Sequence, residues 1–64
     1  MSKITLRAAR INAMLTQAEA ARLLGVGLST LQRWETGKGF PKEPSIRKIC
    51  ALYKVEYNNI QFDI

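Results

Sequence analysis

Residues 16–37, which read TQAEAARLLGVGLSTLQRWETG, decide the fold. Thr16 followed three residues later by Glu19 is a capping-box pattern, in which each side chain satisfies a backbone N–H group at the start of a helix. The alanine- and leucine-rich residues 17–24 favour the helix that follows. Gly25 is predicted to end this helix, because glycine adopts the left-handed conformation that closes a helix at little cost.

A second short helix is predicted from about Leu28 to Glu35, and Thr36-Gly37 ends it. A connection of only two or three residues forces the second helix to leave at a steep angle, so the turn needs small or apolar residues that pack tightly. The sequence supplies such residues at the positions expected to face inward: Ala20, Ala21, Leu24, Val26, Leu31 and Trp34. Residues 17–35 are therefore predicted to form two angled helices instead of one rod.

The flanking segments also follow helical periodicity. In a first helix over residues 3–14, the predicted apolar stripe comprises Ile4, Ala8, Ile11 and Leu15, widened by Leu6 and Ala9. The loop over residues 38–43 contains glycine and proline, which interrupt regular helix. Pro44-Ser45 is expected to begin a fourth helix, since proline suits a first helical turn. Its apolar stripe is Ile46, Ile49, Cys50 and Tyr53.

A short fifth helix over Tyr57–Ile60 is expected to close the domain, with Val55 and Phe62 packed against the rest. No segment shows sustained apolar–polar alternation bounded by hairpin turns, which a half-buried strand would require. The predicted fold is therefore all-α, a compact bundle of four to five short helices. At 64 residues the chain is expected to form one domain, 1–64.

The charge of the chain favours a polyanionic partner. Ten Lys and Arg against five Asp and Glu give a net charge of +5. The excess is uneven, because the part through Lys48 carries nine basic and three acidic residues, and the part from Ile49 onward nets −1. A basic front part is typical of nucleic-acid-binding proteins, although a solvated surface alone can also carry such an excess.

Other functional classes find little support in the sequence. With no histidine and Cys50 as the single cysteine, we expect no intramolecular disulfide, metal site or cofactor, and a reducing cytoplasm as the location. Five scattered acidic residues provide no nucleophile–base pair, so neither catalysis nor a small-molecule substrate is predicted. The longest apolar run, residues 49–53, is far too short to span a membrane. Arginines near the start argue against a secretory signal.

The outer face of the predicted second motif helix, about residues 28–35, carries residues able to contact DNA: Leu28, Ser29, Gln32 and Arg33. The pattern T-Q-A-E-A-A-x-L-L-G-V followed by S-T-L-x-x-W-E-x-G-K resembles the helix-turn-helix of the Cro and phage-repressor-like (XRE) family. The similarity covers nearly the whole chain. It implies a lambda-repressor-like fold and a sequence-specific transcriptional regulator that binds a double-stranded DNA operator, with a homodimer on DNA as one option.

The resemblance also implies roles for individual residues. Leu28, Ser29, Gln32 and Arg33 would contact bases in the major groove. The residues expected to contact phosphates are Gln17, Gly27, Lys38 and Lys42. Arg10 and Glu35 match a partly buried ion pair between the first helix and the end of the recognition helix. Two positions depart from the family pattern, because relatives usually have Ser or Thr at position 27 and a polar residue at position 28.

Two alternatives remain open on the sequence. A helix-turn-helix can serve as a protein-interaction module, such as an antirepressor, an antitoxin or an assembly adaptor, and the departures at Gly27 and Leu28 allow this. The loop Gly39-Phe40-Pro41-Lys42 is also compatible with an excisionase-like architectural DNA-binding factor. That group usually has β-strands after the loop, whereas a helical stripe follows here.

Overall fold

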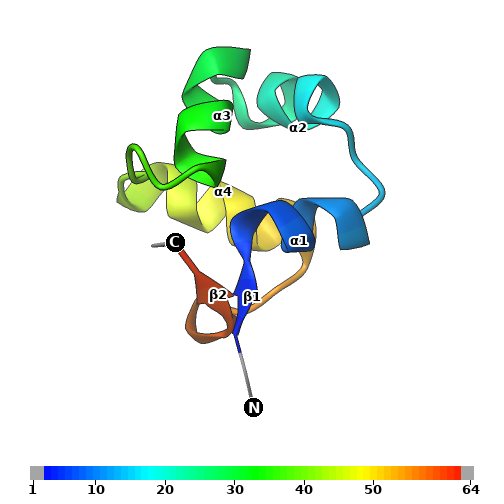
Figure 1. Ribbon diagram of the computed structural model, residues 1–64. Helices are drawn as coiled ribbons and strands as arrows, with labels where there is room; N and C mark the ends of the chain where they lie inside the picture. Colours follow the sequence, from blue (N-terminus) through cyan, green and yellow to red (C-terminus); the bar gives the residue numbers. More distant parts are fainter. Residues whose placement is uncertain (1–2, 63–64) are drawn as a thin grey trace.

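The computed structural model describes residues 3–62. The elements follow in the order β1 (Ile4–Thr5), α1 (Leu6–Asn12), α2 (Gln17–Leu24), α3 (Leu28–Glu35), α4 (Glu43–Tyr53), the 3-10 turn η1 (Tyr57–Asn59) and β2 (Ile60–Gln61). In Figure 1, α2 and α3 occupy one side of the molecule and the two strands the opposite side, with α1 and α4 between them. The helices confirm the predicted all-α bundle and the two angled helices over residues 17–35.

Both ends of α2 are built by local interactions that the sequence predicts. The Thr16 hydroxyl accepts a hydrogen bond of 3.1 Å from the Glu19 backbone N–H, and the Glu19 carboxylate accepts one of 2.9 Å from the Thr16 backbone N–H. These contacts with Thr16, the backbone one first, lower the pKa of the Glu19 carboxyl. Gly25 closes α2 in the left-handed conformation, with φ 74°. After Val26 and Gly27 the chain enters α3 at once.

The core lies where α1, α2, α3 and α4 meet. Its buried residues are Leu6, Ala9, Ala20, Ala21, Leu24, Leu31, Trp34, Ile49, Tyr53 and Ile60. The inward positions predicted for α2 and α3 are confirmed, with Val26 packed against this core from the turn. In α4 only Ile49 and Tyr53 of the predicted stripe are buried, while Ile46 and Cys50 are half-buried. Most of the large apolar side chains of these four helices are thus wholly or partly buried, as a chain of this size requires, and the exposed ones are Ile11, Leu23 and Leu28.

The first helix is shorter than predicted and turned by about one position. Helix α1 spans only Leu6–Asn12, because Ile4–Thr5 form β1 and the Thr5 hydroxyl caps the helix by accepting a 3.1 Å hydrogen bond from the Ala8 N–H. The helix buries Leu6 and Ala9, the two residues that widen the predicted stripe, together with Arg10, whereas Ala8 is half-buried and Ile11 is 46% exposed. Periodicity alone could not decide which face of this helix is buried, since apolar residues occur on both of its faces.

The predicted fifth helix over Tyr57–Ile60 is confirmed only in part. Residues 57–59 form the single turn η1, and Ile60 then leaves it in extended conformation to begin β2. This strand pairs in parallel with β1, with Ile4 opposite Ile60 and Thr5 opposite Gln61. Ile60 is only 2% exposed, so its side chain closes the core from the strand side. Strands of two residues are too short to show the alternation on which the sequence prediction relied.

Candidate nucleic-acid interface

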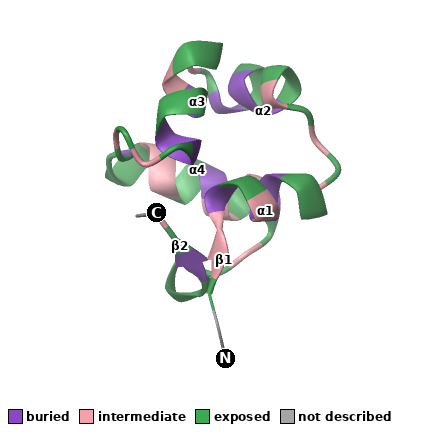
Figure 2. Ribbon diagram, viewed as in Figure 1, coloured by how far each residue is buried: buried purple, intermediate pink, exposed green. Residues whose placement is uncertain are grey.

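Helix α3 has one face in the core and one face in solvent. Leu31 is fully buried, and Trp34 and Glu35 retain 9% and 5% of their exposure. The four residues predicted to contact bases lie on the other side and are all exposed: Leu28, Ser29, Gln32 and Arg33. Figure 2 shows this division, with exposed and buried segments alternating along α3. The structure therefore brings these four side chains to one surface of one helix.

The start of α3 is uncapped by any side chain. Gly27 stands at the N-cap position in an extended conformation, with φ −71° and ψ 153°, and contributes no side-chain hydrogen bond. A Cβ at this position would find its nearest neighbour, the Thr30 hydroxyl oxygen, at 3.9 Å. The site thus has room for a larger residue. The backbone N–H groups of the first turn of α3 point out of the helix end, as at any helix N-terminus, and such groups can bind a phosphate oxygen.

A buried ion pair joins α1 to the end of α3. The Arg10 Nε donates to Glu35 Oε2 at 2.7 Å, and the Arg10 Nη2 donates to Glu35 Oε1 at 3.3 Å. The third guanidinium nitrogen, Nη1, donates to the Leu15 carbonyl oxygen at 2.8 Å. The side chains of Arg10 and Glu35 are 9% and 2% exposed. The pair is therefore more deeply buried than the resemblance implied, and all three nitrogens of the guanidinium are used.

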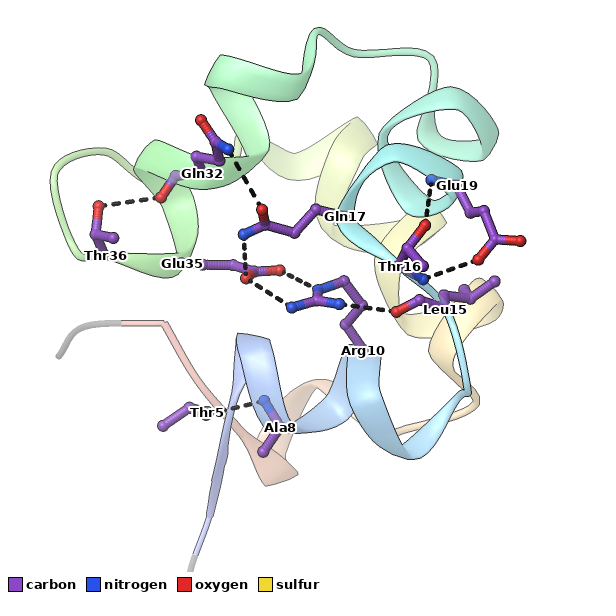
Figure 3. Close-up of polar contacts among 10 residues, drawn as sticks. All are labelled: Thr5, Ala8, Arg10, Leu15, Thr16, Gln17, Glu19, Gln32, Glu35 and Thr36. Carbon is purple, nitrogen blue, oxygen red and sulfur yellow. Dashed lines mark hydrogen bonds and ion pairs between the residues drawn. The ribbon is translucent and has the colours of Figure 1, made fainter.

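Gln17 is in contact with this ion pair and with Gln32. Gln17 Nε2 donates to Glu35 Oε1 at 3.0 Å, and Gln17 Oε1 accepts from Gln32 Nε2 at 3.3 Å. Figure 3 shows the resulting row of side chains from Arg10 to Gln32. The resemblance implied a phosphate contact for Gln17 and a base contact for Gln32, and it did not connect the two residues. Spacing within each helix places a residue on a face, but it does not say which side chains of two different helices meet.

The loop after α3 presents the two lysines predicted to contact phosphates. Lys38 and Lys42 are both exposed, and Lys42 is the N-cap residue of α4. The Lys38 N–H donates to the Arg33 carbonyl oxygen at 3.0 Å, which ties the loop back to α3. Phe40, for which the sequence predicts no role in DNA contact, is 59% exposed and lines a hollow of about 240 Å³ together with Arg33.

Basic side chains outnumber acidic ones on the surface of residues 3–62. Apart from Arg10, every Lys and Arg of residues 3–62 is exposed. Arg47 is paired with Glu43 one helical turn earlier, at 2.7 Å. Within the same residues no group of three or more His, Cys, Asp or Glu side chains could hold a metal ion. No helix in the described stretch is long and apolar enough to cross a membrane.

Comparison with known proteins gives one match. A family model described as a helix-turn-helix domain matches residues 4–58, which is most of the chain. The match begins in β1 and ends in η1, so it includes all four helices. Searches of curated proteins and of solved structures found no match.

Proposed function

Because this chain belongs to the helix-turn-helix domain family, we propose that it binds double-stranded DNA as a sequence-specific transcriptional regulator of the small phage-repressor or Cro type. The observation that carries the proposal is the exposed face of α3, which is polar and basic while the opposite face fills the core. A helix held in this way can enter the major groove with its outer side chains directed at base edges. The proposed regulator is one domain, residues 1–64, and acts in the cytoplasm.

The proposed base contacts follow from the hydrogen-bonding groups on α3. Arg33 can bind guanine through two parallel hydrogen bonds, and Gln32 can bind adenine in the same way. Leu28, 44% exposed at the start of the helix, can pack against a thymine methyl group. Ser29 can donate to a base or to a phosphate. Sequence choice would come from these four side chains.

Affinity would come from phosphates on both sides of the groove. On one side, Gln17 begins α2 and Gly27 precedes the uncapped first turn of α3, where backbone N–H groups favour an anion. On the other side, Lys38 and Lys42 follow α3 in the exposed loop. Contacts of this kind release counterions, so binding should weaken steeply as salt rises. If the protein binds as a two-fold dimer, its half-sites should lie about 10 bp apart.

A pool of random duplex DNA tests the proposal directly. The full chain is mixed with the pool at about 50 mM and about 200 mM salt, where a protein with several phosphate contacts differs strongly in affinity. The bound fraction is then sequenced. We expect salt-sensitive binding and enrichment of a short motif with fixed bases at the positions facing α3. Absence of salt-sensitive binding would overturn the proposal.

A protein-interaction module is the second candidate, and the apolar part of the exposed surface favours it. Leu28 at the start of α3 and Leu23 on α2 are 44% and 50% exposed, and neither side chain can hydrogen-bond to DNA. If the random pool yields no binding, capture of a protein partner through this surface becomes the better explanation. An excisionase-like factor is less well supported, because helix α4, and not a strand, follows the loop after α3.

A further inference from the structure

A row of hydrogen bonds leads from the buried ion pair to the exposed face of α3. Glu35 Oε1 accepts from Gln17 Nε2 at 3.0 Å, and Gln17 Oε1 accepts from Gln32 Nε2 at 3.3 Å. The row begins at a side chain that is 2% exposed and ends at one on the surface that the proposed function directs at DNA. In Figure 3 the side-chain amide oxygen of Gln32 points away from Gln17.

The buried end of the row is fixed. The Glu35 carboxylate accepts two hydrogen bonds from Arg10, whose remaining nitrogen is bound to the Leu15 carbonyl. A carboxylate paired with a guanidinium carries no hydrogen and can only accept. It therefore requires a donor from Gln17.

The direction of each following amide is then determined. A glutamine side chain has its acceptor oxygen on one side and its donor nitrogen on the other. Because the side-chain nitrogen of Gln17 donates to Glu35, its side-chain oxygen faces Gln32. Gln32 must therefore donate a hydrogen bond to that oxygen from its own side-chain nitrogen. Reversing either amide would bring oxygen against oxygen or nitrogen against nitrogen. An isolated surface glutamine has no such constraint, because its two amide orientations differ little in energy.

We propose that Glu35 and Gln17 are positioning residues that hold the Gln32 amide in one orientation and thereby set a preference for adenine at one base pair. The side-chain amide of Gln32 keeps its oxygen and one of its two hydrogens available for a base. Adenine offers the complementary donor and acceptor, N6 and N7, in the major groove. This inference rests on the proposed function, since it names a specificity-determining interaction of the same surface.

Gln17 can also contact a phosphate, and the two roles have different signatures. Gln17 Nε2 uses one hydrogen for Glu35 and keeps a second one. Loss of a phosphate contact lowers the affinity for all sequences alike. Loss of the positioning role lowers only the discrimination at the base pair read by Gln32. The two effects are separable by measuring matched and mismatched sites side by side.

The experiment uses Gln17→Met, which keeps the length of the side chain but removes its amide, together with Gln32→Ala and the double variant. The DNA motif is first selected from the random pool with the wild-type chain. The position at which Gln32→Ala loses its base preference is then identified. Affinities for adenine and for the other three bases at that position are measured for all four proteins, with thermal unfolding to establish that each is folded.

We expect Gln17→Met to reduce the preference for adenine about threefold to tenfold, as loss of one supporting hydrogen bond would. It should have no further effect on discrimination in the Gln32→Ala background. In the free protein, Gln17→Met should also shift the side-chain amide NMR signals of Gln32. Unchanged discrimination, or an equal loss of affinity for all four bases, would overturn the positioning role while leaving DNA binding intact. No salt-sensitive binding by the wild type would overturn the proposed function itself, and the adenine preference with it.

Discussion

The Tyr53 hydroxyl is buried without a hydrogen-bond partner in residues 3–62, although Tyr53 is only 5% exposed. Burial raises the pKa of this phenol to about 12, and the negative charge of Glu35 adds to the effect while Arg10 opposes it. The hydroxyl therefore lies in the field of the buried ion pair but donates to neither member. An unsatisfied buried hydroxyl costs free energy that a phenyl ring would not.

We expect Tyr53→Phe to leave the free energy of unfolding unchanged or to raise it by up to about 1 kcal/mol at neutral pH. The pH dependence is more diagnostic. Because the pKa of Tyr53 is higher in the folded chain than its ordinary value of 10, the neutral phenol favours folding, and this contribution is lost as pH rises from 10 toward 12. Thermal unfolding of both proteins over this range should show the wild type losing more stability than Tyr53→Phe. Parallel pH profiles would contradict the burial of this hydroxyl.

Arg33 and Lys38 should fail in different ways when replaced. Arg33→Ala is expected to cost about 1–3 kcal/mol of binding free energy on the selected DNA motif and to relax the choice at one base pair. Lys38→Ala should weaken all sequences to the same extent and reduce the salt dependence of binding by about one unit of slope. Titrations on the selected motif and on a scrambled duplex distinguish them. If Arg33→Ala lost the same binding free energy on both duplexes, Arg33 would not contact a base.

At the level of the elements, two glycines on either side of Val26 have opposite requirements. Gly25 adopts φ 74°, where a side chain is strained whatever the space around it, and nothing lies within 4 Å of the position of its Cβ. Gly27 has φ −71°, an ordinary value, and caps α3 without a side-chain hydrogen bond. The first glycine is needed for its backbone conformation, whereas the second is not.

The same substitution at both positions should therefore act with opposite sign. Gly27→Ser supplies the missing cap and is expected to raise the free energy of unfolding by a few tenths of a kcal/mol, up to about 1 kcal/mol. Gly25→Ser, the matched control, should lower it by about 1 kcal/mol or more because of the left-handed backbone. Urea unfolding of the two variants measures both values. A destabilising Gly27→Ser would mean that the first turn of α3 cannot accept a hydroxyl cap.

How far the sequence predicts each element depends on where its determining interactions lie. Helices α2 and α3 are predicted to the residue, since the capping box at Thr16 and the left-handed Gly25 act within a few positions. The strands were missed because Ile4 and Ile60, from opposite ends of the described chain, need each other to form them. Periodicity identifies the outward residues of α3. It does not predict the contact between Gln17 and Gln32, because that contact depends on how two helices are placed relative to each other.

Across the whole molecule, the ion pair between Arg10 and Glu35 ties α1 to the helix-turn-helix. Arg10→Met alone leaves a carboxylate buried and is expected to cost about 3–5 kcal/mol. A domain of this size has a total stability of only about 3–10 kcal/mol, so the single variant should be largely or partly unfolded. Arg10→Met combined with Glu35→Leu should recover much of the loss, because neither charge is then left unpaired. Urea unfolding followed by circular dichroism measures the free energy of unfolding of both variants. A double variant no more stable than Arg10→Met would contradict the expected cost of leaving one charge buried and unpaired.

The parallel pairing of β1 with β2 brings the two ends of the described chain together on the side of the bundle away from α2 and α3. A tether attached before β1 would consequently begin on the side away from the recognition helix, whereas β2 runs parallel to β1 and ends nearer the helices. The protein could be fixed to a sensor chip by such a tether, or joined to a reporter domain, with the grooves of a duplex still accessible to α3. Attachment through a side chain of the loop after α3 would instead place the support where DNA is expected to approach.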